Sequence, residues 1–530
     1  MSAANPRRAI EILAALGLIL ALAAGGWTKE LVIERRVVRG TATGRQAPSA
    51  LHTCNDRIAP RWARDTFPVG QVIDSVVSRS DPTQSYALYL PSRYDTAHRW
   101  PVLYLMDPRG RALVPMELFR EPAERHGWIV FSSYNTLSDG PIEPNELALD
   151  AMLGDTQQLL AADLNRLYLS GFSGTAKLGW GFAAQLAGNV AGLIGVGGGL
   201  PPGAAGLGYP SLLENQSFSF FGAAGNTDFN YEEMVTLELL LDNLDIPHRF
   251  VTFEGPHSWL PAELAARAVD WLEVQAMKNG LRPVDPEFVN RLFVRWLEEG
   301  RELEAQGRPL AAAEAYRALV DDFLNLLPVE RLTMAAARAN ELERSDEVKA
   351  RLGKRREILE ASREFDRKLR DHLVRFRESD RPVREAARMI DGLEVEELRR
   401  RAASAGDTVD ALAAQRCLET IFVHGIFYLP RDFIETDPER ALAALEVARA
   451  AKPESPRVCY EEARVHAAAG HTEEALDALE CLVDTGAIRN PEFIEREPFL
   501  KRLAGEGRFV ELMRRARERA AGETPPDGAD

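Results

Sequence analysis

Short apolar runs alternate with longer, helix-length stretches through the first half of the chain. Between residues 67 and 280, eight runs are rich in β-branched, aromatic and other apolar residues and have the length of strands. In chain order they are VGQVIDSVV, SYALYLP, WPVLYLM, GWIVFSSY, RLYLSGF, AGLIGVGG, SFSFFGA and HRFVTFEG. The first two follow each other closely and suit a hairpin. The later runs are separated by helical segments, so the pattern predicts βαβ units and a mostly parallel eight-stranded sheet flanked by helices.

The strand pattern disappears in the second half of the chain. Ala, Leu, Glu and Arg dominate residues 283–520 with a helical period, and Gly280, Pro283 and Pro286 mark the junction. We therefore expect a C-terminal all-α domain over 283–520. The tail 521–530 is rich in Gly, Pro and Asp and is expected to be disordered.

A weak repeat runs through this second half. Ala441 and Leu445 recur 34 residues later as Ala475 and Leu479. Other members of the template are Pro453 and Gly470 at turns and, in a separate segment, Trp296, Gly300, Gly307, Ala312 and Tyr316. The pattern resembles the tetratricopeptide repeat, whose period is 34 residues. That resemblance implies stacked helix pairs that form a groove for a partner protein; a generic helical bundle is the alternative.

Composition limits the classes of function. The 530 residues are 45% hydrophobic and 27% charged, which is ordinary for folded protein, and the net charge of −16 argues against a nucleic-acid-binding surface. The four cysteines form no CxxC pair and no cluster with metal-ligand spacing. We therefore expect no metal and no organic cofactor. Cys459 and Cys481 can pair if the chain is exported, and are otherwise two buried thiols.

The N-terminus has the pattern of an export signal. Arg7 and Arg8 precede an apolar run over residues 12–24 that contains the small-x-small triplet 21–23. The run is shorter than the roughly 20 residues of a membrane-spanning helix. Residues 1–27 are therefore interpreted as a signal peptide or a retained signal anchor, and residues 28–66 as a tether. The expected location is the periplasm or the exterior, with anchoring to the inner membrane as the alternative to cleavage.

The clearest catalytic pattern is YLSGFSGTAKLGW, residues 168–180. An apolar strand ends at Gly171-Phe172-Ser173-Gly174, and a helix follows. A nucleophilic serine on a tight strand-to-helix turn needs small residues two positions away, because the backbones approach closely there. The amide of Gly174 at the helix start then points to a developing oxyanion. Thr175 replaces the small residue that usually completes this motif, and its β-branch is expected to crowd the turn.

A serine nucleophile needs a base and an acid at the same edge of the sheet. Asp228 follows the seventh run, and His257 follows the eighth. The order Ser, Asp, His and the place of each after a strand resemble the α/β-hydrolase superfamily over residues 67–280. The resemblance implies that His257 takes the proton of Ser173 and that Asp228 orients His257. His98, His126 and His248 precede strands, and Asp242 and Asp245 lie near a helix end, so they are weaker candidates.

The resemblance also implies a second oxyanion donor in the loop after the third strand, MDPRGRAL. Related esterases often have His-Gly-Gly at this place, whereas this chain has Asp107-Pro108-Arg109-Gly110-Arg111. Proline has no N–H, so the candidates are the amides of Arg109, Gly110 and Arg111, and Gly110 is favoured. A plain strand-to-helix turn is the alternative interpretation.

The connection GGGLPPGAAGLGYPSLLENQ is too short for a cap domain, so we expect an open cleft. Trp180, Tyr231 and Trp259 are near the triad in sequence and either line a subsite or pack in the core. The elbow, the missing cap and the export signal resemble exported polyhydroxybutyrate depolymerases and feruloyl esterases. That resemblance implies a hydrolase of small or polymeric carboxylic esters. A catalytically inactive scaffold and a prolyl-oligopeptidase-like peptidase are the alternatives.

Overall fold

The computed structural model describes residues 67–186, 188–200, 218–244, 246–404 and 409–522. These residues form two compact units. The first comprises the residues up to Asn226 and Asn230–Lys349, and the second comprises the short segment Thr227–Phe229 and the residues from Ala350 onward. The first unit contains all the strands. The second unit is helical.

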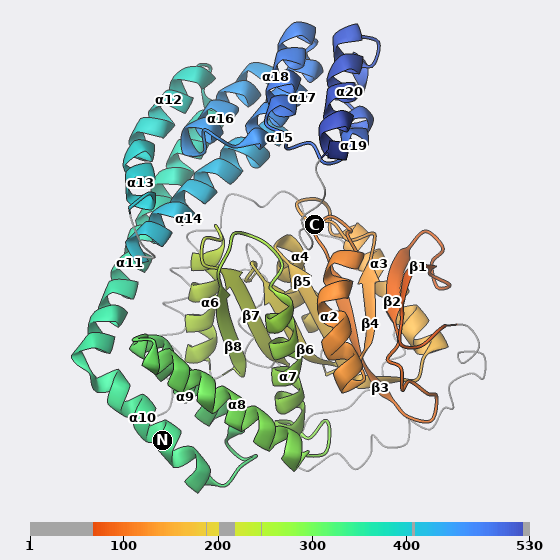
Figure 1. The fold of residues 1–530 in the computed structure, drawn as a ribbon, viewed down its shortest axis with the longest axis vertical. Coiled ribbons are helices and arrows are strands. Elements are labelled where there is room, and N and C mark those ends of the chain that lie inside the picture. The colour runs from red at the N-terminus through yellow and green to blue at the C-terminus, as the bar shows by residue number, and fades with distance from the viewer. Residues whose placement is uncertain (1–66, 187, 201–217, 245, 405–408, 523–530) are drawn as a thin grey trace. The chain divides into compact units, whose positions relative to one another are not determined.

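The first unit is built on an eight-stranded sheet (Figure 1). Its strands are β1 (Val72–Val77), β2 (Ser85–Tyr89), β3 (Trp100–Met106), β4 (Ile129–Ser133), β5 (Ala162–Phe172), β6 (Val190–Val196), β7 (Ser219–Gly225) and β8 (His248–Phe253). Their order in the sheet is β1-β2-β4-β3-β5-β6-β7-β8. The pairs β1–β2 and β2–β4 are antiparallel, and the other five pairs are parallel. This is the topology of the α/β-hydrolase fold, so the predicted sheet and hairpin are confirmed.

Helices cover both faces of this sheet. Figure 1 shows α2 (Leu113–His126) and α7 (Ala262–Lys278) in front of the strands. Side chains of α3 (Glu143–Leu159), α4 (Gly174–Gln185) and α6 (Tyr231–Asn243) join the hydrophobic core of the other face. Strands β4, β6 and β7 are buried along their whole length, which explains their continuous apolar sequence.

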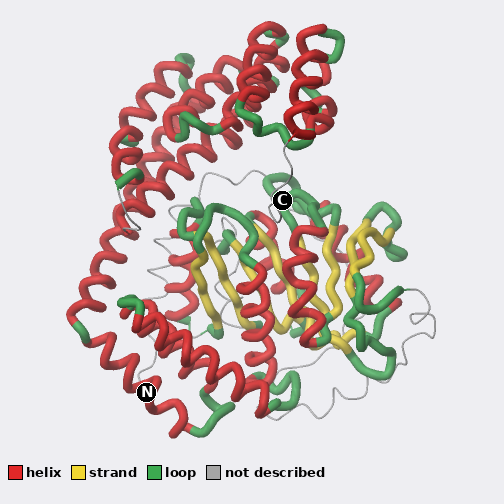
Figure 2. Tube along the Cα trace, viewed as in Figure 1, coloured by secondary structure: helices red, strands yellow, loops and turns green. Residues whose placement is uncertain are grey.

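The compact unit that contains the sheet continues beyond residue 280, where the sequence predicted its end. It includes α8 (Pro286–Ala305), α9 (Pro309–Phe323) and α10 (Val329–Arg344). The helices begin where the composition changes, as expected, but the first of them pack as part of the first unit. Figure 2 shows the helices in red and the strands of the sheet in yellow, and along the chain α7 separates the last strand from α8.

Buried carboxylates attach these helices to α7. Asp322 on α9 accepts hydrogen bonds from the indole of Trp271 at 2.7 Å and from the guanidinium of Arg249 on β8. Asp270 on α7 binds Arg295 of α8 at 2.6 Å. The same helix carries the buried Glu273. Burial alone would raise the pKa of Glu273, but the guanidinium groups of Arg166 and Arg282 hold this pKa below its ordinary value. The ionised carboxylates therefore tie elements from both sides of the predicted boundary together.

The second unit is an array of helices with its own apolar core. Its elements are α11 (Asp346–Glu378), α12 (Pro382–Gly392), α13 (Val395–Ala402), α14 (Val409–Val423), the π-helical turn η3 (His424–Tyr428), α15 (Leu429–Phe433), α16 (Pro438–Ala451), α17 (Pro456–Ala469), α18 (Thr472–Asp484), α19 (Pro491–Arg496), η4 (Leu500–Leu503) and α20 (Gly507–Gly522). Helix α11 begins four residues before the unit boundary.

The positions of the proposed repeat pack as helix pairs require. A β-carbon at Gly300 would lie 2.7 Å from the ring of Tyr316, so α8 and α9 cross at that glycine. Ala441 and Leu445 on α16 and their counterparts Ala475 and Leu479 on α18 are all fully buried. Gly470 ends α17 in the left-handed conformation that favours glycine. The assignment of these pairs to a tetratricopeptide-like repeat stays a prediction.

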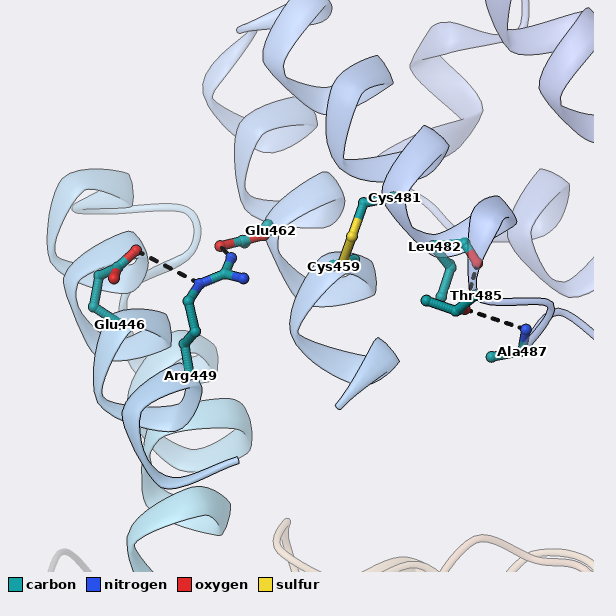
Figure 3. The surroundings of a disulfide bond; sticks show 8 residues. All are labelled: Glu446, Arg449, Cys459, Glu462, Cys481, Leu482, Thr485 and Ala487. Carbon is teal, nitrogen blue, oxygen red and sulfur yellow. Dashed lines mark hydrogen bonds and ion pairs between the residues drawn. A yellow bond between two sulfur atoms is a disulfide. The ribbon is translucent and has the colours of Figure 1, made fainter. Parts of the chain in front are cut away.

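Cys459 on α17 and Cys481 on α18 form a disulfide, the first of the two alternatives left open by the sequence (Figure 3). Close by, Arg449 of α16 pairs with Glu462 of α17. Cys417 is a free, partly buried thiol. Cys54 lies outside the described residues, as do the predicted signal segment 1–27, all of the tether 28–66 and most of the tail.

No helix in the part of the chain that the structure describes is sufficiently long and apolar to cross a membrane.

We predict that Asp322→Ala destabilises the first unit by about 3–5 kcal/mol, because it leaves the guanidinium of Arg249 buried without its carboxylate. Chemical denaturation followed by tryptophan fluorescence measures the change. The neighbouring exposed Asp321 supplies the matched control, Asp321→Ala, for which we expect a change below about 1 kcal/mol. Equal losses in the two variants would contradict the attachment described above.

The double variant Cys459→Ser, Cys481→Ser is expected to unfold more easily than the oxidised protein by roughly 2–4 kcal/mol, because the cross-link no longer restricts the unfolded chain. Reductant should lower the stability of the native protein to that of the variant and leave the variant unchanged. Thiol titration in denaturant should count two more thiols after reduction of the native chain. An unchanged count would show that these cysteines are free.

Candidate active site

Six parallel-paired strands end at one edge of the sheet, and the candidate residues follow these ends. Ser173 follows β5, Asp228 lies in the loop after β7, and His257 lies in the loop after β8. Neighbouring loops at this edge touch each other. The amide of Asn226 donates to the carbonyl of Phe253 at 2.8 Å, and the amide of Gly255 donates to the side chain of Asn226 at 3.1 Å. The loops that carry Asp228 and His257 are therefore adjacent.

Ser173 occupies a strained turn between β5 and α4. Its φ of 57° and ψ of −125° lie in a region that residues with a side chain rarely adopt. Close backbone contacts hold it there. A β-carbon at Gly171 would lie 2.5 Å from the backbone of Thr175, and one at Gly198 would lie 2.2 Å from the carbonyl oxygen of Ser173. The amide of Ser173 donates to Val196 at 2.8 Å. This is the geometry of a nucleophile elbow, as the sequence predicted.

Thr175 supports the turn by hydrogen bonding. Its side chain is fully buried, and its hydroxyl lies 2.6 Å from the carbonyl of Met106 and 2.8 Å from that of Phe172. The hydroxyl oxygen also accepts from the amide of Phe172 at 3.1 Å. The expected crowding is therefore offset by bonds that join the elbow to the end of β3.

His257 lies against the residue that precedes the nucleophile. Its ring centroid is 4.5 Å from that of Phe172, and the side chain is partly exposed. Trp259, two residues further on, is buried and packs on the same phenyl ring at 5.7 Å. Phe172 therefore contacts the histidine loop directly beside Ser173.

Asp228 is fully buried in the turn between β7 and α6. A buried carboxylate in the loop next to that of His257 suits the acid of a triad. The proton relay from Ser173 through His257 to Asp228 stays a prediction.

The weaker histidine candidates lie away from this edge. His98 is exposed and bonds Asp95 at 2.9 Å, and His126 ends α2 and bonds Asp270 at 2.7 Å. His248 begins β8, where Asp242 approaches it at 3.5 Å. Asp245 lies outside the described residues. His98, His126 and His248 each lie at or just before the start of a strand, whereas the elbow follows the end of β5, so these histidines do not reach it.

The role of the Gly110 amide as the second oxyanion donor stays a prediction, and the structure shows that this amide has a local acceptor. The amide of Gly110 donates to the carbonyl of Asp107 at 3.1 Å. The amides of Arg109 and Arg111 donate to the Asp107 carboxylate at 2.9 Å and 3.2 Å. All three candidate amides of this loop are therefore engaged in a local turn. The other predicted donor, the amide of Gly174, is at the first position of α4, where no intrahelical acceptor exists.

Asp107 is the anchor of this edge. Its side chain is fully buried and receives the guanidinium of Arg111 at 2.9 Å and the indole N–H of Trp259 at 2.9 Å. Burial alone would raise the pKa of Asp107, but these hydrogen bonds outweigh it and hold the pKa below the ordinary value of 3.8. Because the pKa of Asp107 is lower in the folded than in the unfolded protein, the ionised carboxylate stabilises the fold at pH values above the unfolded pKa. This stabilisation is lost as the pH falls through the folded pKa. Asp107 is therefore ionised at neutral pH.

Sequence reasoning missed this anchor. From the sequence alone, Asp107 is only a departure from His-Gly-Gly, and Trp259 is only a subsite or core residue. The signal that points to it is a carboxylate at a strand end followed by amides at the second and fourth positions, a frequent side-chain-capped turn. The other two aromatic candidates pack against the hydrophobic core, Trp180 fully buried and Tyr231 partly exposed. Trp180 is fully buried against Phe218 and Phe220, and Tyr231 lies beside Phe250.

The expected open cleft involves the connection 197–216, most of which lies outside the described residues. Within the described residues, no cluster of His, Cys, Asp and Glu is arranged to hold a metal ion. The groups gathered at this edge are a strained serine, an imidazole, carboxylates and helix-start amides, which are the parts of an acyl-transfer site.

No family model matches the sequence, and no curated protein matches it either. Among solved structures, the chain is similar to FphF, a fluorophosphonate-binding serine hydrolase of Staphylococcus aureus, with 15% identity and a TM-score of 0.34 over 39% of this chain and 99% of that one. It is also similar to the S-formylglutathione hydrolase FrmB of the same organism, with 13% identity, a TM-score of 0.32, and coverage of 38% and 99%. A third is Est1E from Butyrivibrio proteoclasticus, with 13% identity, a TM-score of 0.31, and coverage of 38% and 99%. The fold assignment rests on the strand order and the elbow described above.

Trp259→Phe tests the link between Asp107 and the histidine loop. The variant keeps the ring but removes a buried hydrogen bond of the kind that contributes about 1–3 kcal/mol when one partner is charged. We expect the reactivity of Ser173 toward a fluorophosphonate probe to fall about tenfold, because a change of 1.4 kcal/mol in the barrier is a factor of 10. Trp180→Phe is the matched control, since the indole nitrogen of Trp180 has no hydrogen-bond partner among the described residues. Equal reactivity of the two variants would show that the indole bond does not position His257.

Proposed function

We propose that this protein is a serine hydrolase that cleaves carboxylic esters through an acyl-enzyme intermediate. The observation that carries the proposal is Ser173, held at a φ of 57° on the strand-to-helix turn after β5. Such strain persists only where surrounding structure enforces it, and here glycine contacts at Gly171 and Gly198 do so. The arrangement exposes a hydroxyl at the edge where an imidazole and a buried carboxylate also lie.

The proposed reaction uses the chain's own residues. Ser173 Oγ attacks the ester carbonyl carbon while His257 accepts the hydroxyl proton, and the carbonyl oxygen becomes an oxyanion near the amide of Gly174. The tetrahedral intermediate collapses, and the leaving alkoxide takes the proton from His257. A water then attacks the acyl-enzyme by the same steps in reverse order and releases the acid. Asp228 orients the imidazole and balances its charge.

One observation favours a different class of function. The β3–α2 loop has its three candidate donor amides bound to Asp107, so a site with only the Gly174 amide would stabilise the oxyanion weakly. Losing one donor costs about 10²–10³ in rate in well-studied hydrolases. An inactive hydrolase-fold scaffold is therefore the competing proposal. A peptidase of the prolyl-oligopeptidase type uses the same triad order and differs only in the substrate.

Export and partner binding complete the proposal. The arginine-apolar pattern of residues 1–27 and the disulfide between Cys459 and Cys481 support an oxidising compartment outside the cytoplasm. The helix pairs of residues 283–520 offer surfaces of the kind that stacked repeats use to bind partner proteins. The substrate is proposed to be a small or polymeric ester, with no cofactor in the reaction.

A fluorophosphonate probe tests the catalytic proposal. We expect the wild-type chain to be labelled and Ser173→Ala to be unlabelled, because the probe bonds only to an activated hydroxyl. Hydrolysis of p-nitrophenyl esters of several acyl lengths should follow the same pattern. Folded wild type that neither labels nor hydrolyses would support the scaffold. Labelling with turnover of peptides but not of esters would support the peptidase.

A further inference from the structure

The loop between β4 and α3 lies directly over the elbow, and neither the triad nor the Asp107 turn accounts for it. A β-carbon at Gly174 would lie 2.5 Å from Cβ of Ser138 and 3.5 Å from its Oγ. Ser138 is partly exposed and packs on the residue whose amide is the first oxyanion donor. A hydroxyl therefore lies close to Gly174, whose amide is the predicted first oxyanion donor.

The backbone of Ser138 is fixed from several sides. Its amide donates to the carbonyl of Pro108 at 3.0 Å, and the preceding residue, Leu137, forms a β-bridge with Arg109. The buried side chain of Asn145 binds both the amide and the carbonyl of Leu137, at 3.0 Å and 2.9 Å. The loop is therefore held rigidly to the Asp107 turn and to α3, as a preorganised donor requires.

The distances allow one oxygen to contact both donors. The amide nitrogen of Gly174 lies about 2.5 Å from the β-carbon position by standard bond lengths, so Ser138 Oγ is at most about 6 Å from that nitrogen. An oxyanion lies about 2.7–3.1 Å from each of its donors, so two donors up to about 6 Å apart can share it.

We infer that the Ser138 hydroxyl is the second oxyanion donor of this site, in place of the loop amides that Asp107 binds. The inference rests on the proposed ester hydrolysis. It makes Ser138 a catalytic residue that the sequence analysis did not single out, and it explains how a site without His-Gly-Gly stabilises its intermediate. The donor comes from the loop after β4 instead of the loop after β3.

The resting state of the hydroxyl fits this role. Ser138 Oγ lies 2.6 Å from a carboxylate oxygen of Asp139 and donates to it. Asp139 is exposed and has a φ of 58°, so the chain turns sharply just after Ser138. A rotation about χ1 from one staggered position to another redirects the hydroxyl, and water solvates the released carboxylate. An oxyanion is an acceptor of equal charge, so the exchange retains a charge-assisted hydrogen bond.

Steady-state kinetics of the full chain with p-nitrophenyl acetate test the inference. Ser138→Ala keeps the β-carbon against Gly174 and should lower kcat about 100-fold with KM within about threefold, as loss of one oxyanion donor does. Labelling by a fluorophosphonate should slow by a similar factor, because its phosphoryl oxygen occupies the same place. Ser138→Cys preserves the shape with a weak donor and should match Ser138→Ala. Asp139→Asn should keep at least the wild-type kcat.

A kcat of Ser138→Ala within threefold of wild type, with thermal stability unchanged, would overturn the inference while leaving the Ser173 chemistry in place. A loss of activity in Ser138→Ala and Ser138→Cys that follows a fall in melting temperature, or a rise in KM with kcat unchanged, would also overturn it, because the serine would then be structural. A wild type that is inactive toward probe and ester removes the proposed function and this inference together.

Discussion

Close backbone packing at the carboxyl edge of the sheet is the constraint on which the candidate site depends. Among the described residues at this edge, Gly171, Gly198 and Gly225 have no room for a side chain because backbone atoms lie against them. A β-carbon would lie 2.5 Å from the backbone of Thr175 at Gly171, 2.2 Å from Ser173 at Gly198, and 2.2 Å from Gly255 at Gly225. These contacts hold β5, β6, β7 and the histidine loop at distances that only glycine permits, and they keep Ser173 in a conformation that it would not adopt in an open turn.

The buried carboxylate of Asp107 shows how this edge combines stability with chemistry. One ionised group accepts two backbone amides, a guanidinium and the indole of the histidine loop. The turn is stable because every buried donor around it has an acceptor. The same bonds occupy these amides, so in the proposed reaction the stabilisation of an intermediate is assigned to Gly174 and to a side chain outside the loop. An N–H group that donates to Asp107 cannot at the same time donate to an oxyanion.

The appended helices follow a similar logic. Asp270 and Glu273 on one turn of α7, with Asp322 on α9, bind guanidinium groups from β8, α8 and the segment after α7. Asp322 also accepts a hydrogen bond from the indole of Trp271 on α7. Because a buried charge needs a partner of opposite charge, α8 and α9 pack as part of the first unit. The helices beyond Lys349 have their own apolar core and a disulfide between α17 and α18. The helical sequence that begins near residue 283 is therefore divided between the two units.

The sequence alone was sufficient for the strands, their mostly parallel arrangement, the elbow and the order of Ser173, Asp228 and His257 along the chain. These features are local: periodicity, glycine spacing and place after a strand are written in consecutive residues. Tertiary structure decided what depends on distant partners. Asp107 meets Trp259 across 152 positions, Ser138 reaches Gly174 from another loop, and Asp322 finds Arg249 across 73 positions. No pattern in a single segment indicates which buried donor a carboxylate will bind, because that choice follows from packing of the whole sheet edge.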